Sequence, residues 1–64
     1  MIMCITKDKF NKIIDKEIDY KYDWFICYDS GMWVACDNSQ GDMWVEEFNS
    51  LDNACKWLKG EFEL

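Results

Sequence analysis

The cysteines are the side chains best suited to bind a metal ion or to act as nucleophiles. Zinc ligands usually occur as closely spaced CxxC pairs or together with histidine. The chain has no CxxC pair and no histidine. We therefore predict no metal site. Cys4, Cys27, Cys36 and Cys55 are expected to be reduced thiols that serve as small apolar side chains, with Cys27 and Cys36 close enough across a hairpin to form a thiol pair as the alternative.

Carboxylates are the other candidates for chemistry. Without histidine the chain lacks the ordinary general base near neutral pH, and the GxSxG, GxGxxG and P-loop patterns are all missing. Glu46 and Glu47 are adjacent, but neighbouring residues of a strand point to opposite faces and cannot form a catalytic dyad. The segment 37–42 is rich in oxygen ligands but lacks the EF-hand spacing, so a polar turn explains it better. We predict that the chain is not an enzyme and binds no cofactor.

Acidic and basic residues are segregated along the chain. The 64 residues include 13 Asp plus Glu and 7 Lys plus Arg, for a net charge of −6, and no basic residue occurs between Lys21 and Lys56. All the basic residues are lysines, and the absence of arginine argues against direct binding to nucleic acid or to an anionic membrane. An acidic surface of this kind favours docking on a basic protein surface. The alternative is a surface that only keeps the protein soluble.

Hydrophobic periodicity predicts two helices. Thr6 has the features of an N-cap, and apolar residues then recur at helical spacing, which predicts a helix over 7–18. Asn49 or Ser50 is expected to cap a second helix that ends near Gly60. The apolar stripe of this second helix consists of Leu51, Ala54, Cys55, Leu58 and Phe62.

Alternating side chains predict three strands between these helices. The strands cover 20–28, 32–36 and 43–48, with a tight turn at 29–31 and a second turn at 37–42. The expected fold class is α+β in the order α-β-β-β-α, a three-stranded antiparallel meander packed with two helices in a single domain over 1–64. We expect both helices to cover one face of the sheet. The other face would then be open to solvent or to a partner.

The predicted partner-binding surface combines carboxylates with indole rings, because interfaces concentrate binding energy in aromatic anchors with a polar rim. Two other functions fit the same composition. The aromatic residues could form a cage for a cationic or sugar-like ligand, or the open face or an edge strand could form a homodimer. The residues predicted to contact a protein partner are Asp23, Asp29, Asp37, Asp42, Glu46, Glu47, Trp33 and Trp44.

In size, acidity and the lack of a catalytic constellation, the chain resembles small phage and mobile-element proteins, including anti-CRISPR and other anti-defence inhibitors. Some anti-CRISPR proteins share the α-β-β-β-α order, and no family motif is carried over. The resemblance implies a stoichiometric inhibitor that mimics nucleic acid and blocks the basic nucleic-acid site of a host defence nuclease. Met1–Ile5 is too short for a signal-peptide core, and no apolar run is long enough to span a membrane. We expect a cytoplasmic protein, located in the host cytoplasm if a phage encodes it.

Overall fold

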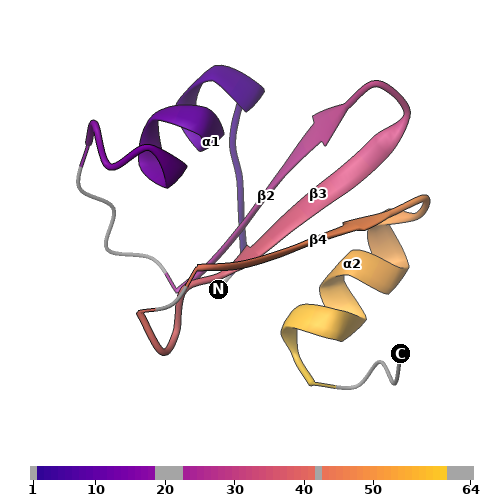
Figure 1. Ribbon diagram of the computed structural model, residues 1–64. Helices are drawn as coiled ribbons and strands as arrows, with labels where there is room; N and C mark the ends of the chain where they lie inside the picture. The colour runs from indigo at the N-terminus through magenta and orange to yellow at the C-terminus, as the bar shows by residue number, and fades with distance from the viewer. Residues whose placement is uncertain (1, 19–22, 42, 61–64) are drawn as a thin grey trace.

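The computed structural model describes residues 2–18, 23–41 and 43–60 (Figure 1). The described elements follow the order β1 (Ile2–Cys4), α1 (Lys7–Ile14), β2 (Trp24–Asp29), β3 (Met32–Asp37), β4 (Trp44–Phe48) and α2 (Leu51–Leu58). The strands form one 4-stranded sheet in the order β1-β2-β3-β4. The α+β class is therefore confirmed. The predicted three-stranded antiparallel meander is wrong, because the sheet has an additional strand that is parallel to its neighbour.

The additional strand is β1, which pairs in parallel with β2 so that Ile2 lies opposite Trp24 and Cys4 opposite Ile26. The ladder continues one residue further, where the Ile5 N–H donates to the Ile26 carbonyl at 2.9 Å. Parallel neighbours need a crossover connection, and α1 lies in that connection. A strand of 3 residues is too short to show alternation. The sequence therefore contains no local signal for this pairing.

Helix α1 begins as predicted but ends earlier. The Thr6 side chain caps it by accepting the Lys9 N–H at 3.2 Å. The helix ends at Ile14 because Lys16 takes a left-handed conformation with φ of 61°. The Lys16 N–H then donates to the Ile13 carbonyl at 3.0 Å, which is the hydrogen bond of a Schellman C-cap. The predicted range 7–18 is therefore too long.

Helix α2 has the predicted caps at both ends. Ser50 is the N-cap and accepts the Asn53 N–H at 3.1 Å. Gly60 follows the last turn with φ of 77°, a conformation that glycine adopts without steric cost. The predicted apolar stripe is wrong at Leu51, which is 41% exposed. Phe62 lies outside the described residues.

The hairpin between β2 and β3 has the predicted tight turn. Ser30 and Gly31 both have positive φ, at 51° and 85°, which is the backbone of a type I′ turn and matches the right-handed twist of the strands. Strand β2 begins at Trp24, and the predicted strand residues 20–22 lie outside the described part of the chain. The predicted strands 32–36 and 43–48 correspond to β3 and β4.

The helices lie on opposite faces of the sheet (Figure 1), so the expectation that both cover one face is wrong. The reason lies in β2, where Phe25 and Cys27 point to one face and Ile26 to the other, so that each face carries apolar groups needing cover. The α1 face has a core of Phe10, Ile13, Phe25, Cys27 and Cys36. The α2 face has a core of Ile26, Ala35, Phe48, Ala54 and Leu58.

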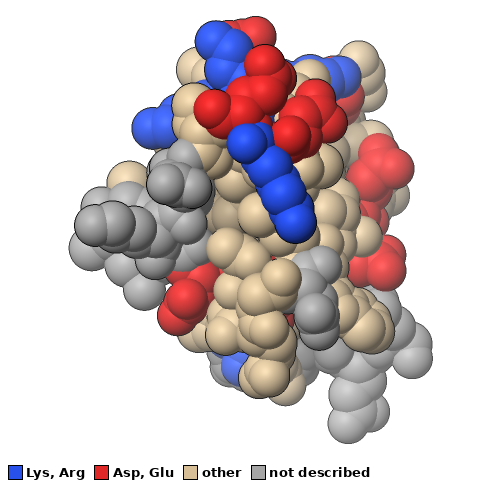
Figure 2. Space-filling model, turned by 60° about the vertical axis from the view of Figure 1, so that its left-hand side comes forward, with Lys and Arg blue, Asp and Glu red and all other residues tan. Residues whose placement is uncertain are grey.

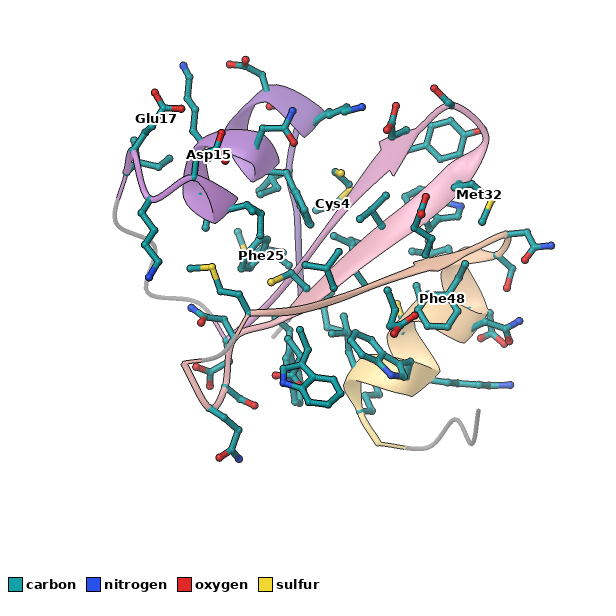
Figure 3. The ribbon with its side chains drawn as sticks, in the orientation of Figure 1. Cys4, Asp15, Glu17, Phe25, Met32 and Phe48 are labelled. Atoms are coloured by element: carbon teal, nitrogen blue, oxygen red, sulfur yellow. The ribbon has the colours of Figure 1, made fainter. Side chains whose placement is uncertain are left out.

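Each helix covers only part of its face. Helix α1 packs against β2, whereas α2 packs against β3 and β4. In Figure 3, Phe25 lies between the sheet and α1, and Phe48 lies on the side of α2. The part of the α1 face that β4 contributes therefore extends beyond α1. None of the helices described here is long and apolar enough to cross a membrane.

Candidate protein-binding surface

The lysines and the sheet acids occupy different elements. Two lysines form i,i+4 ion pairs on their own helices, Lys12 with Asp8 at 3.3 Å and Lys56 with Asp52 at 3.0 Å. Figure 2 accordingly shows blue and red side chains intermixed in its upper part. All lysines of the described segments lie on a helix or within two residues of its end, at Lys7, Lys9, Lys12, Lys16, Lys56 and Lys59. The described parts of β2, β3 and β4 carry acids and no base.

Strand β4 is the most exposed element of the sheet. Trp44 is 65% and Val45 41% exposed, and Glu46 and Glu47 are exposed as well. Glu46 lies opposite Ala35 and therefore on the α2 face, whereas Glu47 lies on the α1 face. Neither glutamate forms a salt bridge with a lysine of the described segments. The predicted opposite orientation of the two glutamates is confirmed.

The β2–β3 hairpin determines which neighbouring strand the N–H and carbonyl groups of each β3 residue face. Asp29 and Met32 close a two-residue turn, so they form a hydrogen-bonded pair, and such pairs alternate with non-bonded pairs along an antiparallel ladder. The Asn38 N–H donates to the Asp23 carbonyl at 2.6 Å, at a position where this alternation requires a hydrogen bond. The odd-numbered residues of β3 therefore direct their backbone groups toward β4.

The same alternation identifies the outward groups of β4. Ala35 lies opposite Glu46, so the Glu46 N–H and carbonyl bond to β3. Val45 and Glu47 consequently direct their N–H and carbonyl groups away from the sheet. In the described part of the chain no strand pairs with this outer side. It is a free sheet edge, ready to accept another strand.

Asp29 is held in an ion pair and differs from the other sheet acids. The Lys7 Nζ donates to an Asp29 oxygen, and the Ser30 hydroxyl donates to the other oxygen at 3.0 Å. These hydrogen bonds lower the pKa of Asp29, and the same bond to Asp29 raises the pKa of Lys7. Asp29 therefore stays ionised, and its negative charge is balanced by Lys7 within the protein. The sequence could not show this pair because Lys7 is far away along the chain.

A hollow of about 240 Å³ opens between α1 and β4 on the α1 face. Its floor includes Cys27, where burial raises the pKa of the thiol, so that this group stays neutral. Among the described residues of its wall Phe10 is the one aromatic, so these residues do not form an aromatic cage. The lining residues are Lys7, Phe10, Asn11, Cys27, Asp29, Val34, Val45 and Glu47.

The two predicted indole anchors differ in exposure. Trp33 is half-buried on the α2 face, where it packs edge-on against Tyr28 with ring centroids 4.9 Å apart. Trp44 at the start of β4 projects into solvent. Of these two indoles, only Trp44 is therefore available as an anchor for a partner, since an anchor must be exposed before binding.

Two further predicted residues, Asp23 and Asp37, lie at the end of the sheet where β4 begins. Asp37 is cross-strand to both Trp24 and Trp44, and its Oδ1 accepts the Ser39 N–H at 3.0 Å and the Ser39 hydroxyl at 2.6 Å. The buried Trp24 Nε1 has no hydrogen-bond partner among the residues that the structure describes. Asp23 is exposed just before β2. Asp42 falls outside the described residues.

The structure thus brings Trp44, Glu46 and Glu47 together on β4 and adds Val45, which the sequence analysis did not select. The predicted strand 43–48 contained a signal for Val45, because an apolar residue between Trp44 and Glu46 must face the side opposite to both. We define the β4 edge as the exposed residues Trp44–Glu47 together with the outward backbone groups of Val45 and Glu47. No protein-family model, curated protein or solved structure matches the chain.

Proposed function

We propose that the chain is a non-catalytic acidic protein that binds a basic surface of another protein. The observation that carries this proposal is the β4 edge, where an exposed indole and two exposed glutamates, which form no salt bridge with a lysine of the described residues, stand beside free backbone groups. The interaction surface is smaller than a whole sheet face, because each face has its own helix.

Charge complementarity defines the class of partner. Exposed carboxylates that are not held in a salt bridge attract basic patches and steer their approach. The strongest basic patches on intracellular proteins are nucleic-acid-binding sites, which carry clustered lysine and arginine. We propose that the partner is a nuclease-type effector of host defence and that the chain blocks its nucleic-acid site. Glu46, Glu47 and Asp23 supply the charge, and Trp44 supplies the anchor.

The proposal is tested by capturing the partner from host lysate on the immobilised protein. We expect a nucleic-acid enzyme to be retained, to elute as salt rises and to be displaced by a polyanion such as heparin, since exposed ion pairs are screened by salt. The double variant Glu46→Gln/Glu47→Gln should retain much less of it.

A matched control removes the same number of negative charges at a site away from β4. Asp15 and Glu17 lie at the end of α1 far from β4 (Figure 3), so Asp15→Asn/Glu17→Gln should retain the partner as well as the unmodified protein does. Retention that does not respond to salt or polyanion would contradict the proposal. Equal losses in the two double variants would contradict it as well.

A further inference from the structure

We infer that the β4 edge binds an extended, cation-bearing segment of the partner, which joins the sheet as an additional antiparallel strand. This inference rests on the proposed function and specifies how the basic surface is recognised. The outward N–H and carbonyl groups of Val45 and Glu47 supply the main-chain hydrogen bonds of such strand addition. The opposite sheet edge is less suited, because β1 has only 3 residues whereas β4 has 5.

The side chains of β4 specify which residues the added strand must carry. The residue opposite Glu47 lies on the α1 face and should be a lysine or arginine. The next residue lies opposite Glu46 on the α2 face, diagonal to the exposed ring of Trp44. Arginine suits this second position, because a guanidinium can pair with a carboxylate and stack on an indole. Two consecutive cations are therefore expected.

The third position of the added strand should be apolar. It lies opposite Val45, whose side chain is 41% exposed and lines the hollow between α1 and β4. A valine or isoleucine there would cover Val45 and remove apolar area from water. The resulting pattern is two cations followed by one branched apolar residue, in an extended segment.

A second copy of the chain is a poorer occupant of the same edge. Antiparallel pairing of Trp44–Phe48 with itself sets Glu46 against Glu46, and like charges directly opposite each other destabilise a sheet. The net charge of −6 on each copy adds to the repulsion. Charge complementarity therefore favours a cationic strand from another protein.

The probe for this inference is a cyclic β-hairpin peptide with one strand reading Thr-Lys-Arg-Val-Thr. Cyclisation holds the strand extended and so lowers the entropic cost of binding. A matched hairpin carries glutamate in place of lysine and arginine. Binding is measured by titration while the amide signals of the protein are followed by NMR. We expect the cationic hairpin to bind, with the largest shifts at the Val45 and Glu47 amides, and the acidic hairpin not to bind.

Two kinds of variant test the contacts. Val45→Pro removes an outward N–H that β3 does not use, a change that edge strands tolerate, and should weaken binding by about tenfold or more. Val45→Thr keeps the N–H and loses only part of the apolar contact, so it should weaken binding much less than Val45→Pro does. Glu46→Arg keeps the backbone unchanged and should also weaken binding by about tenfold or more. A hairpin with glutamate at the arginine position should then restore binding to Glu46→Arg, whereas Asp15→Arg should leave the original affinity unchanged.

The outcomes separate the inference from the proposed function. Strand addition would be overturned if the hairpin binds but shifts amide signals away from Val45 and Glu47. It would also be overturned if Glu46→Arg binds the cationic hairpin as tightly as the unmodified protein does. Both results would leave the proposal of an acidic binding protein in place. A dimer of the free protein in sedimentation that is lost in Val45→Pro would assign the edge to a second copy and also overturn it. No binding of either hairpin would overturn it too. If the hairpin behaves as expected but no basic protein is captured from lysate, strand addition stands and the proposed cellular target fails.

Discussion

The side chain of Cys36 shows how completely the α1 face excludes water at its centre. Cys36 is fully buried against Phe25 and its neighbours, and desolvation raises the pKa of its thiol to about 11, with the nearby Asp37 charge adding to the shift. Cys27 has a raised pKa for the same reason. These two thiols are core groups, which confirms the prediction that they act as small apolar residues.

The raised pKa of Cys36 predicts a loss of stability at alkaline pH. The unfolded thiol loses its proton near pH 9.0, whereas the folded thiol keeps its proton up to about pH 11. Between these values the folded state binds more protons, so the free energy of unfolding falls as pH rises. Urea denaturation from pH 8.5 upward measures this fall. It should be shallower in Cys36→Ala than in the unmodified protein.

Cys55→Ala is the matched control, because Cys55 lies on α2 and is only partly buried. This variant should keep the full alkaline loss. Identical slopes in Cys36→Ala and the unmodified protein would show that the thiol is not desolvated and would contradict the packing of the α1 face.

At the scale of the elements, the ends of the helices are encoded locally and their placement is not. Thr6, Ser50 and Gly60 could be recognised from sequence because a cap depends on a few neighbouring residues. The early end of α1 at Ile14 could not, because it depends on a lysine in a conformation that usually selects glycine. The pairing of β1 with β2 and the assignment of each helix to its face depend on contacts between distant segments.

The left-handed Lys16 predicts a stabilising substitution. Lys16→Gly should raise the free energy of unfolding by about 1 kcal/mol or less, because relief of the left-handed strain exceeds the added entropy of the unfolded glycine. Urea denaturation at pH 7 measures the change. Lys12→Gly inside α1 is the control and should lower stability by about 1 kcal/mol. Equal losses in the two variants would mean that α1 continues through Lys16.

At the scale of the whole molecule, the position of the helices decides which acids are available. Among the described residues, the strands carry acids and no lysine, and α1 brings Lys7 into an ion pair with Asp29 and into the hollow that Glu47 also lines, whereas neither β4 glutamate forms a salt bridge. The sequence was sufficient to select Trp44, Glu46 and Glu47 as candidates. It was insufficient to show that Asp29 is paired or that Trp33 is half-buried, because both depend on how the sheet packs.

Amide hydrogen exchange of the unbound protein measures whether the sheet ends in a free β4 edge. We expect alternation along β4, with slow exchange at Glu46 and Phe48, whose N–H groups bond to β3, and fast exchange at Val45 and Glu47. Uniformly slow exchange along the strand would show that another segment or a second copy covers the edge. That result would rule out strand addition at β4.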